Sequence, residues 1–564
     1  MAEGDFAWPV VSPHGPGYPL FLAALLALGS GSLKFAIACQ AILGAFTATL
    51  IASIGRDRFG DRAGLFAGLA YALYAPAVYI DTALLSEGLL LFLLTLVLFA
   101  LGRPKGLRYT AIAGLSSGLA ILVRPTAIVF ATVFLLPLII RRAWTTVAVL
   151  VAVCAAVVLP AVAKSYASSH NLSIQGYGGV NVYIGDSPLH NGRASFRLGA
   201  GWDALNAEAS RAGIADPVQQ DRYYLSKALT EIRAQPAAFT KLLAAKVVWL
   251  AQSEEARDSH SFYFFTSQSP VLRVLPRWAM LFPLACIGVL VIARRKPRPP
   301  TSPLVLFTLA GTATTVLLVV GTRYRMPLVP VMAIAAGVAI DALADATRLR
   351  KTRDLTAFAG IGVAAIAISH VLHDHGNTNL AEEWAFTGSS LVSEHDLDGA
   401  TAAYERALQL DRRSGLAWDG LGLAQYDAGR LADARESLAR ALAIDPANGR
   451  ALFHLGLADE HDGKLAEAAD RYRRAAELSP YDADVLQRLA TVLGLAGRPA
   501  EARDAMRRSL ELNPMNGEAW LDLCLLSLDL RDVAGASAAL QRAEELGANP
   551  QKIAFASQAL ARAR

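Results

Sequence analysis

The C-terminal third of the sequence repeats itself every 34 residues. Turn-forming and small residues return at this spacing: Pro446, Pro480 and Pro514; Gly429, Gly463 and Gly497; and Ala400, Ala434, Ala468, Ala502 and Ala536. A sequence period of this length is typical of stacked supersecondary units, each of which buries its apolar face only against its neighbours. This part of the chain is therefore predicted to fold as a helical solenoid.

The large residues of the repeat identify its type. Tyr404, Leu438, Tyr472, Met506 and Leu540 fall one period apart, with Trp384 and Trp418 at a second recurring position. This is the tetratricopeptide pattern, with two antiparallel helices per repeat. The alanines let the two helices approach, the large residues fill the gap between them, and the proline ends the second helix. About five repeats fit between residues 381 and 550, followed by a helical tail. Such a domain is expected to hold a protein or glycan partner on its concave surface.

Long apolar segments fill the sequence before residue 372. We read them at about 33–54, 63–80, 87–102, 109–123, 126–140, 144–162, 278–293, 303–320, 327–343 and 355–371. Only 18% of the residues are charged, against about 25% in a soluble protein. The chain is therefore expected to be an integral membrane protein, and a purely cytosolic enzyme is excluded.

Basic residues cluster in the short connections between these segments. The clusters are Arg56/Arg58/Arg62, Arg103/Lys105/Arg108, Arg141/Arg142, Arg294/Arg295/Lys296/Arg298 and Arg348/Arg350/Lys351/Arg353. With ten crossings all of them fall on one side, which the positive-inside rule makes cytoplasmic. The loop 163–277 and the repeat domain are then predicted to lie outside the cytoplasm, at a bacterial inner or plasma membrane. The clusters form no continuous stripe, so no nucleic-acid partner is expected.

These patterns predict a predominantly all-α protein. Residues 1–372 should form a polytopic membrane helix bundle with a mid-chain extracytoplasmic loop domain, 373–380 a linker, and 381–564 the α-solenoid. The apolar stretch from Tyr18 to Leu28 is too short to span a bilayer and suits a helix in the interface. Because this start comes out extracytoplasmic, we expect a first transmembrane helix to precede it.

Acidic residues at the end of a membrane helix are candidates for function, because the bilayer penalises an idle charge. Asp81 and Glu87 flank an extracytoplasmic turn between two spans. Solvation beside a helix N-terminus is the simpler interpretation. We rank Glu87 first and Asp81 second as catalytic candidates.

Arginines that are predicted to lie on the extracytoplasmic side are exceptions to the positive-inside rule, and they form a second set of candidates. Arg323 and Arg325 flank Tyr324 in one turn, and Arg124 lies in another. A guanidinium binds phosphate with two parallel hydrogen bonds, although such residues also reach for lipid headgroups. We predict that these residues bind substrate.

The outer loop contributes the last candidates. Asn181 and Tyr183 lie in a glycine-rich stretch, 178–186, that suits the lining of a sugar pocket or an ordinary turn between strands. Cys39, Cys154, Cys286 and Cys524 have no paired spacing and are interpreted as small core residues. No metal site is predicted, and whether a divalent metal is needed is left open.

Several stretches resemble polytopic glycosyltransferases of the GT-C type, in the branch of the protein O-mannosyltransferases and the lipid A aminoarabinose transferase. They are Gly4-Asp5-Phe6 followed by His14-Gly15-Pro16-Gly17-Tyr18-Pro19; Leu85-Ser86-Glu87; Gly118 to Thr126; Gly179 to Gly185; and Arg323 to Pro327. The family's principal acidic motif precedes the first of these stretches and has no counterpart in this sequence. Bacterial members with C-terminal tetratricopeptide repeats are also familiar.

The resemblance implies a sugar transferase that uses a polyprenyl-phosphate sugar as its lipid-linked donor, with no certain cofactor. In that scheme a carboxylate matched by Glu87 removes the proton of the acceptor hydroxyl, while Arg323 and Arg325 stabilise the departing phosphate. The repeats would recruit an acceptor or partner. Two alternatives stay open: an O-antigen ligase or oligosaccharyltransferase-like enzyme, and a non-catalytic membrane-anchored scaffold.

Overall fold

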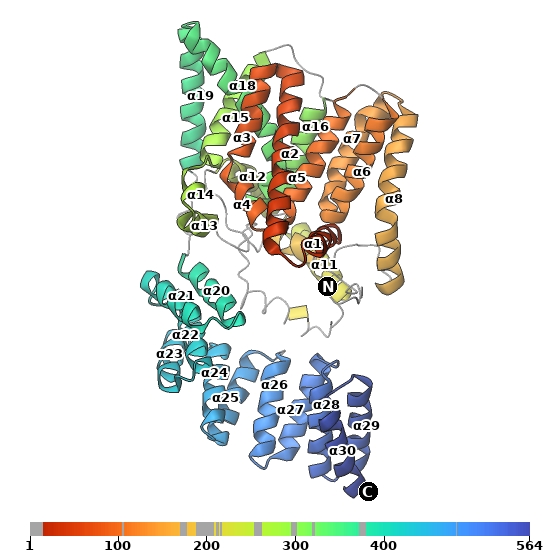
Figure 1. Ribbon diagram of the computed structural model, residues 1–564, viewed down its shortest axis with the longest axis vertical. Coiled ribbons are helices and arrows are strands. Elements are labelled where there is room, and N and C mark those ends of the chain that lie inside the picture. Colours follow the sequence, from red (N-terminus) through yellow and green to blue (C-terminus); the bar gives the residue numbers. More distant parts are fainter. Residues whose placement is uncertain are drawn as a thin grey trace. The chain divides into compact units, whose positions relative to one another are not determined.

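A computed structural model describes the chain at residues 15–103, 106–169, 178–187, 208–209, 214, 217–252, 262–294, 302–317, 322–371, 380–480 and 482–563. The chain divides into two compact units, residues 1–378 and 379–564 (Figure 1). Among the described residues all regular structure is helical. The predicted all-α fold class is confirmed.

The first unit is a bundle of apolar helices. Before the outer loop its helices are α1 (Gly17–Leu28), α2 (Leu33–Phe59), α3 (Asp61–Ala72), α4 (Ala75–Thr82), α5 (Ser86–Leu101), α6 (Leu107–Val123), the short 3-10 helix η1 (Pro125–Ala127), α7 (Ile128–Ile140) and α8 (Trp144–Ser169). After the loop they are α15 (Trp278–Arg294), α16 (Pro303–Val316), α17 (Thr322–Arg325), the 3-10 helix η2 (Met326–Leu328), α18 (Val329–Arg348) and α19 (Thr352–Val371). The apolar segments predicted from the sequence fall on these helices, with 63–80 on the bent pair α3 and α4, and residues 318–320 of the segment 303–320 lie outside the described residues.

Not every helix reaches the length of a bilayer. In the described part of the chain, four helices are long and apolar enough to cross a membrane, or five if the pair α3 and α4, bent by 51°, counts as one span. The remaining apolar helices, including α5 and α6, are 10–17 residues long. The unit is therefore a helical membrane bundle in which several helices are short.

Glycines let the helices of this bundle approach closely. A methyl group added at Gly64 of α3 would meet the backbone of α2 at Ala52 and Arg56, and one added at Gly114 of α6 would meet Leu150 of α8. Small residues at these positions permit close packing in a membrane, where lipid supplies no hydrophobic driving force. The helices that carry the candidate residues are held by such contacts.

Two ion pairs connect helix ends that carry basic residues at one end of the bundle. Arg62 at the start of α3 pairs with Asp345 near the end of α18, at 2.8 Å. Arg103 after α5 pairs with Asp57 near the end of α2, at 3.1 Å. Since α1, α4 and the start of α5 lie at the opposite end (Figure 1), the helix ends that carry the candidate acids are far from those that carry Arg62 and Arg103.

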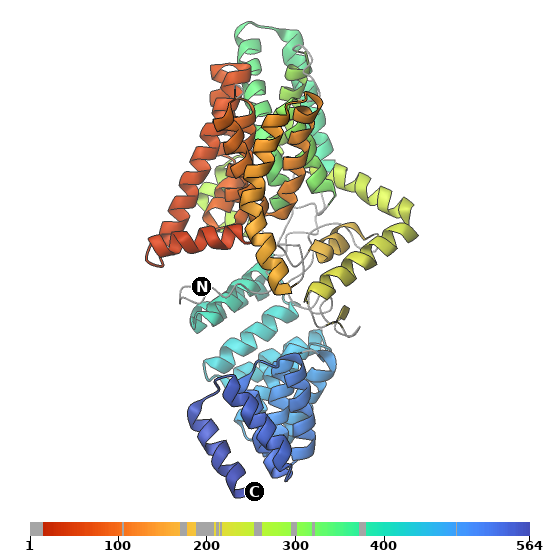
Figure 2. The same ribbon diagram turned by 90° about the vertical axis from the view of Figure 1, so that its right-hand side faces the viewer.

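The segment between α8 and α15 contains helices of its own, and α11 and α12 form an open V beside the bundle (Figure 2). The described helices are α9 (Gly178–Asp186), α11 (Pro217–Ala234), α12 (Pro236–Leu250), α13 (Phe262–Gln268) and α14 (Pro270–Val274). Lys246 of α12 is fully buried and pairs with Asp186 of α9 at 2.5 Å. Burial lowers the pKa of the Lys246 amine. The ion pair between Lys246 and Asp186 joins α12 to α9.

The second unit stacks helix pairs and ends on a single helix. The pairs are α20 (Leu380–Ser393) with α21 (Leu397–Leu410), α22 (Gly415–Asp427) with α23 (Leu431–Ile444), α24 (Gly449–His461) with α25 (Leu465–Leu478), α26 (Ala483–Leu495) with α27 (Pro499–Leu512), and α28 (Gly517–Asp529) with α29 (Val533–Glu545), before α30 (Pro550–Ala563). The recurring glycines 429, 463 and 497 adopt φ near +75°, which side chains disfavour. They follow the first helix of each of these pairs.

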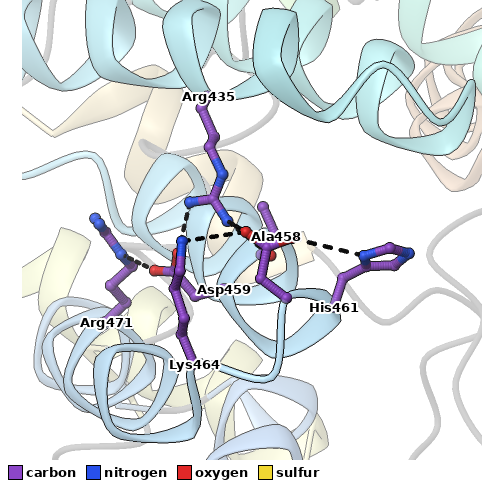
Figure 3. Close-up of polar contacts among 7 residues, drawn as sticks. Arg435, Ala458, Asp459, His461, Lys464 and Arg471 are labelled. Atoms are coloured by element: carbon purple, nitrogen blue, oxygen red, sulfur yellow. Dashed lines mark hydrogen bonds and ion pairs between the residues drawn. The ribbon is translucent and has the colours of Figure 1, made fainter.

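A network of ion pairs joins the second and third helix pairs (Figure 3). Arg435 of α23 donates to Asp459 Oδ1 at 2.6 Å, to Asp462 Oδ2 at 2.8 Å and to the carbonyl of Ala458 at 2.9 Å. The Asp459 side chain is only 3% exposed and also accepts a hydrogen bond from Arg471. One guanidinium therefore fixes the end of α24 against the preceding repeat.

We predict that Arg435→Ala destabilises the solenoid by about 1–3 kcal/mol, because a buried carboxylate loses part of its compensation. The control is Arg542→Ala, which removes a solvent-exposed pair with Glu545 and is expected to cost about 0–1 kcal/mol. Hydrogen exchange of α23 and α24 in the full-length protein measures the difference. Equal protection in the two variants would show that the network contributes no more than a surface pair.

Candidate functional site in the membrane unit

Glu87 lies in the first turn of α5, where the helix dipole favours an anion. Its side chain is 1% exposed. An isolated carboxylate buried this deeply in a bundle would carry a large free-energy penalty, so it requires a counter-charge. The structure supplies two.

Two arginines from distant parts of the chain pair with Glu87. Arg124, which follows α6, donates from Nη2 to Glu87 Oε1 at 2.5 Å. Arg323 of α17 donates from Nε to the same oxygen at 2.8 Å. Both arginine side chains are 19% exposed. The site therefore combines one carboxylate with two guanidinium groups at the junction of α5, α6 and α17.

The two carboxylate oxygens of Glu87 have different surroundings. Oε1 accepts both arginine hydrogen bonds, whereas the hydrogen bond that reaches Oε2 in the described part of the structure comes from Ser86 Oγ, at 3.4 Å. Oε1 thus holds the arginines in place. Oε2 keeps lone pairs that can accept a proton from a bound hydroxyl group.

A small cavity lies beside this group. Arg124, Thr126 and Tyr324 supply its polar wall, and the other lining residues are Leu90, Leu94, Ala127, Phe130, Thr314 and Pro327. Its volume is about 20 Å³, enough for about one water molecule. The Arg124 guanidinium lies over the Tyr324 ring at 5.2 Å, which orients it along the cavity wall. Most of the other lining side chains are apolar.

Asp81 lies close to the same turn but in a different environment. It is 8% exposed, near the end of α4, and its carboxylate packs against Gly44 of α2 and Gly88 of α5. Among the described residues no hydrogen bond or ion pair reaches this carboxylate. Neither Asp81 nor Glu87 is a solvated surface acid, which was the simpler interpretation of the sequence.

Arg325 contacts a different set of groups from Arg323. It is buried, donates from Nη1 to the carbonyl of Gln252 at 2.9 Å, and lies over the Trp278 ring at 4.5 Å. These contacts tie α17 to the end of α12 and the start of α15. From the sequence, Arg323 and Arg325 were expected to bind the phosphate together. In the structure Arg323 and Arg124 both contact Glu87, whereas Arg325 contacts Gln252 and Trp278.

Asn181 and Tyr183 lie on a helix, α9, and not on a turn. Tyr183 is buried against Tyr224 of α11, with the Lys227 ammonium 4.8 Å from its ring centre. Asp221 of α11 accepts hydrogen bonds from the N–H groups of Gly179 and Val180, at 2.7 and 3.1 Å. This capping by a distant carboxylate stabilises a helix that its own glycines and valines disfavour.

The sequence interpretation missed the role of Gln40 and of the stretch before α1. Gln40 is a fully buried amide in the first third of α2, and the hydroxyl of Tyr18 donates to its Oε1 at 3.0 Å. Gly15 and Gly17 lie against the backbone of Leu122 and Val123 at the end of α6, directly before Arg124. A glutamine inside an apolar span was the available signal.

Candidate metal ligands are not clustered here: the described residues contain no group of three or more His, Cys, Asp and Glu side chains that could hold an ion. The chemistry available within the described site is that of a carboxylate, two guanidinium groups and a tyrosine.

We predict that Gly17→Ala destabilises the bundle by about 1–3 kcal/mol, since its new methyl carbon would lie 2.8 Å from the backbone of Leu122 and Val123. The control is Gly360→Ala in α19, where nothing lies within 4 Å and the better helix former should be neutral or stabilising. Thermal unfolding of the detergent-solubilised protein compares the two. An unchanged melting temperature for Gly17→Ala would show that α1 does not pack on α6 as described.

Glu87 and Arg124 of this site lie in a part of the chain that is similar to a known family. Residues 13–166 match the dolichyl-phosphate-mannose-protein mannosyltransferase family. The match contains Asp81, Glu87 and Arg124 and ends before Arg323. The predicted resemblance is confirmed over these residues, and the family points to a membrane glycosyltransferase.

The repeat unit also matches a known family. Residues 387–449, 420–483 and 488–552 match the tetratricopeptide repeat, so this unit is a protein-interaction domain. Among solved structures, the chain is similar to MamA (26% identity, TM-score 0.26, covering 28% of this chain and 93% of MamA). It is similar to pilF of Pseudomonas aeruginosa (22%, 0.31, 32% and 83%) and to YrrB (21%, 0.28, 32% and 94%). No curated protein matches the chain.

Proposed function

We propose that the membrane unit transfers a sugar from a polyprenyl-phosphate donor to a hydroxyl group of an extracytoplasmic glycan, lipid or protein. The observation that carries this proposal is the buried group of Glu87, Arg124 and Arg323, in which one carboxylate and two guanidinium groups meet. The family match over residues 13–166 supports the same class of reaction.

In the proposed reaction, the acceptor oxygen attacks the anomeric carbon of the sugar while the bond from that carbon to the phosphate oxygen breaks. Glu87 Oε2 takes the proton of the acceptor hydroxyl, and the donor leaves as polyprenyl phosphate. A displacement from the opposite face inverts the configuration at the anomeric carbon. General-base assistance of this kind contributes about 10²–10⁴-fold to a rate.

The arginines have two functions in this scheme. They hold Glu87 in its charged form and place positive charge where the phosphate develops its negative charge. Arg124 lines the cavity and is therefore the arginine best placed to meet the phosphate.

The proposal is tested with the purified full-length protein in lipid nanodiscs. We expect consumption of a polyprenyl-phosphate-linked sugar when an extract of the cell envelope supplies acceptors, and no reaction with the corresponding nucleotide sugar. Transfer from the nucleotide sugar alone would contradict the proposed donor class. Absence of transfer from every lipid-linked sugar would favour a membrane-anchored scaffold.

We predict that the repeat unit lies outside the cytoplasm. The helix ends that carry Arg62 and Arg103 are basic, and the positive-inside rule places basic ends on the cytoplasmic side. A phosphatase that is active only outside the cytoplasm, fused after Arg564, should be active. Fluorescence from a fused reporter that matures only in the cytoplasm would reverse the orientation. The proposed site would then face the cytoplasm.

A further inference from the structure

Gln40 is a polar side chain placed where polarity is costly. It lies in the first third of α2, one of the helices long and apolar enough to span a membrane, and none of its surface is exposed. A buried amide in such a helix costs free energy unless its donors and acceptor are all used. The hydrogen bonds of Gln40 therefore indicate what it holds.

Its amide joins three segments. Nε2 donates to the carbonyl of Ile80, at 3.2 Å, and to the carbonyl of Leu85, at 3.0 Å. Oε1 accepts from the hydroxyl of Tyr18 at 3.0 Å. Gln40 thus spans the turn from the end of α4 to the start of α5 and connects it to α1.

This turn does not close easily by itself. The N–H of Leu85 reaches back to the carbonyl of Ile80 at 3.3 Å, in the pattern that usually ends a helix on glycine. Here Leu84 occupies the left-handed position, with φ of 50°. A side chain disfavours that conformation, so the surroundings must hold the turn in place.

We propose that Gln40, itself oriented by Tyr18, is a positioning residue that locks the turn 80–85 and so fixes Glu87 against Arg124 and Arg323. Glu87 follows this turn by two residues, and Gly88 leaves the space in which the Gln40 amide and the Asp81 carboxylate approach α5. The effect on catalysis rests on the proposed function. The effect on the turn does not.

The primary test is Gln40→Met, which keeps the approximate volume and removes both donors and the acceptor. In the full-length protein we expect faster hydrogen exchange at the amides of residues 83–86, with α2 and the second half of α5 unchanged. Transfer from the lipid-linked donor should fall about 10²-fold, the loss that a misplacement of about 1 Å produces. The loss should appear in kcat, with the donor KM changed by less than about threefold.

Tyr18→Phe provides a milder second variant. It removes the hydrogen bond to Oε1 and leaves both donations to the turn, so its loss should be smaller than that of Gln40→Met. Because Tyr18 acts through Gln40, adding Tyr18→Phe to Gln40→Met should cause no further loss. Additive losses in the double variant would overturn the proposed order of contacts.

The matched control is Thr95→Val in α5, another fully buried polar side chain, whose hydroxyl has no hydrogen-bond partner in the described part of the structure. Exchange and transfer should both be unchanged in this variant. Unchanged exchange at residues 83–86 in Gln40→Met, or exchange raised throughout the bundle, would overturn the proposal. If the wild-type protein transfers no sugar, the proposed function fails, while the exchange result still decides whether Gln40 locks the turn.

Discussion

Replacing Glu87 with glutamine should reduce sugar transfer by about 10²–10⁴-fold, the contribution of a general base. The substitution keeps the size of the side chain and removes the charge that Arg124 and Arg323 surround. The amide oxygen can still accept from one arginine, so the protein should remain inserted. The initial rate of donor consumption, normalised to the amount of monodisperse protein, measures the effect.

Asp81→Asn is the comparison variant for this experiment, because Asp81 is a neighbouring buried carboxylate that no described ion pair engages. Its loss should be smaller than that of Glu87→Gln. A loss under about threefold for Glu87→Gln would remove Glu87 from the chemistry. Equal losses for the two variants would leave the ranking of the carboxylates without support.

Substitutions of Arg124 and Arg323 should have the next largest effect. Alanine at either position is expected to lower transfer by about 10²–10³-fold, as for loss of a group that stabilises developing charge. Lysine keeps the charge but loses the planar fork, so its effect should be intermediate, and the donor KM should rise. Titration with donor at saturating acceptor separates these contributions.

Two further arginines complete this comparison, one as a control and one as a test. Arg273→Lys alters an exposed side chain of α14 that donates to the carbonyl of Ser267, and it should leave transfer unchanged. Arg325→Lys decides between two interpretations. If Arg325 binds the phosphate, the donor KM should rise. If its contacts with Gln252 and Trp278 define its role, the protein should lose thermal stability with an unchanged donor KM.

The repeat unit was predictable because its information is periodic. Each helix pair repeats the same alanine and large position, three of the five pairs share the glycine, and each pair contacts mainly its neighbours. Local rules therefore suffice for its fold. The turn that replaces glycine with Arg531, at φ of 60°, still follows the period because its flanking helices fix the geometry.

The candidate site was predictable only in parts. Glu87, Arg124 and Arg323 were each conspicuous as charges at helix ends, yet their pairing joins residues 37 and 236 positions apart, which no local pattern reveals. Helix α9 was missed because its cap, Asp221, lies on another helix. Gln40 was missed because its partners Ile80 and Leu85 are carbonyl groups, which carry no sequence signal.

The central claim is that Glu87 and Arg323 act as one unit in sugar transfer, and a double-mutant cycle tests it most directly. Donor consumption is measured for the wild-type protein, Glu87→Gln, Arg323→Ala and the double variant, in nanodiscs at one pH and salt concentration. If the ion pair is the active unit, the double variant should be no slower than the slower single variant. Losses that multiply, or a wild-type protein that consumes no lipid-linked sugar, would contradict the account.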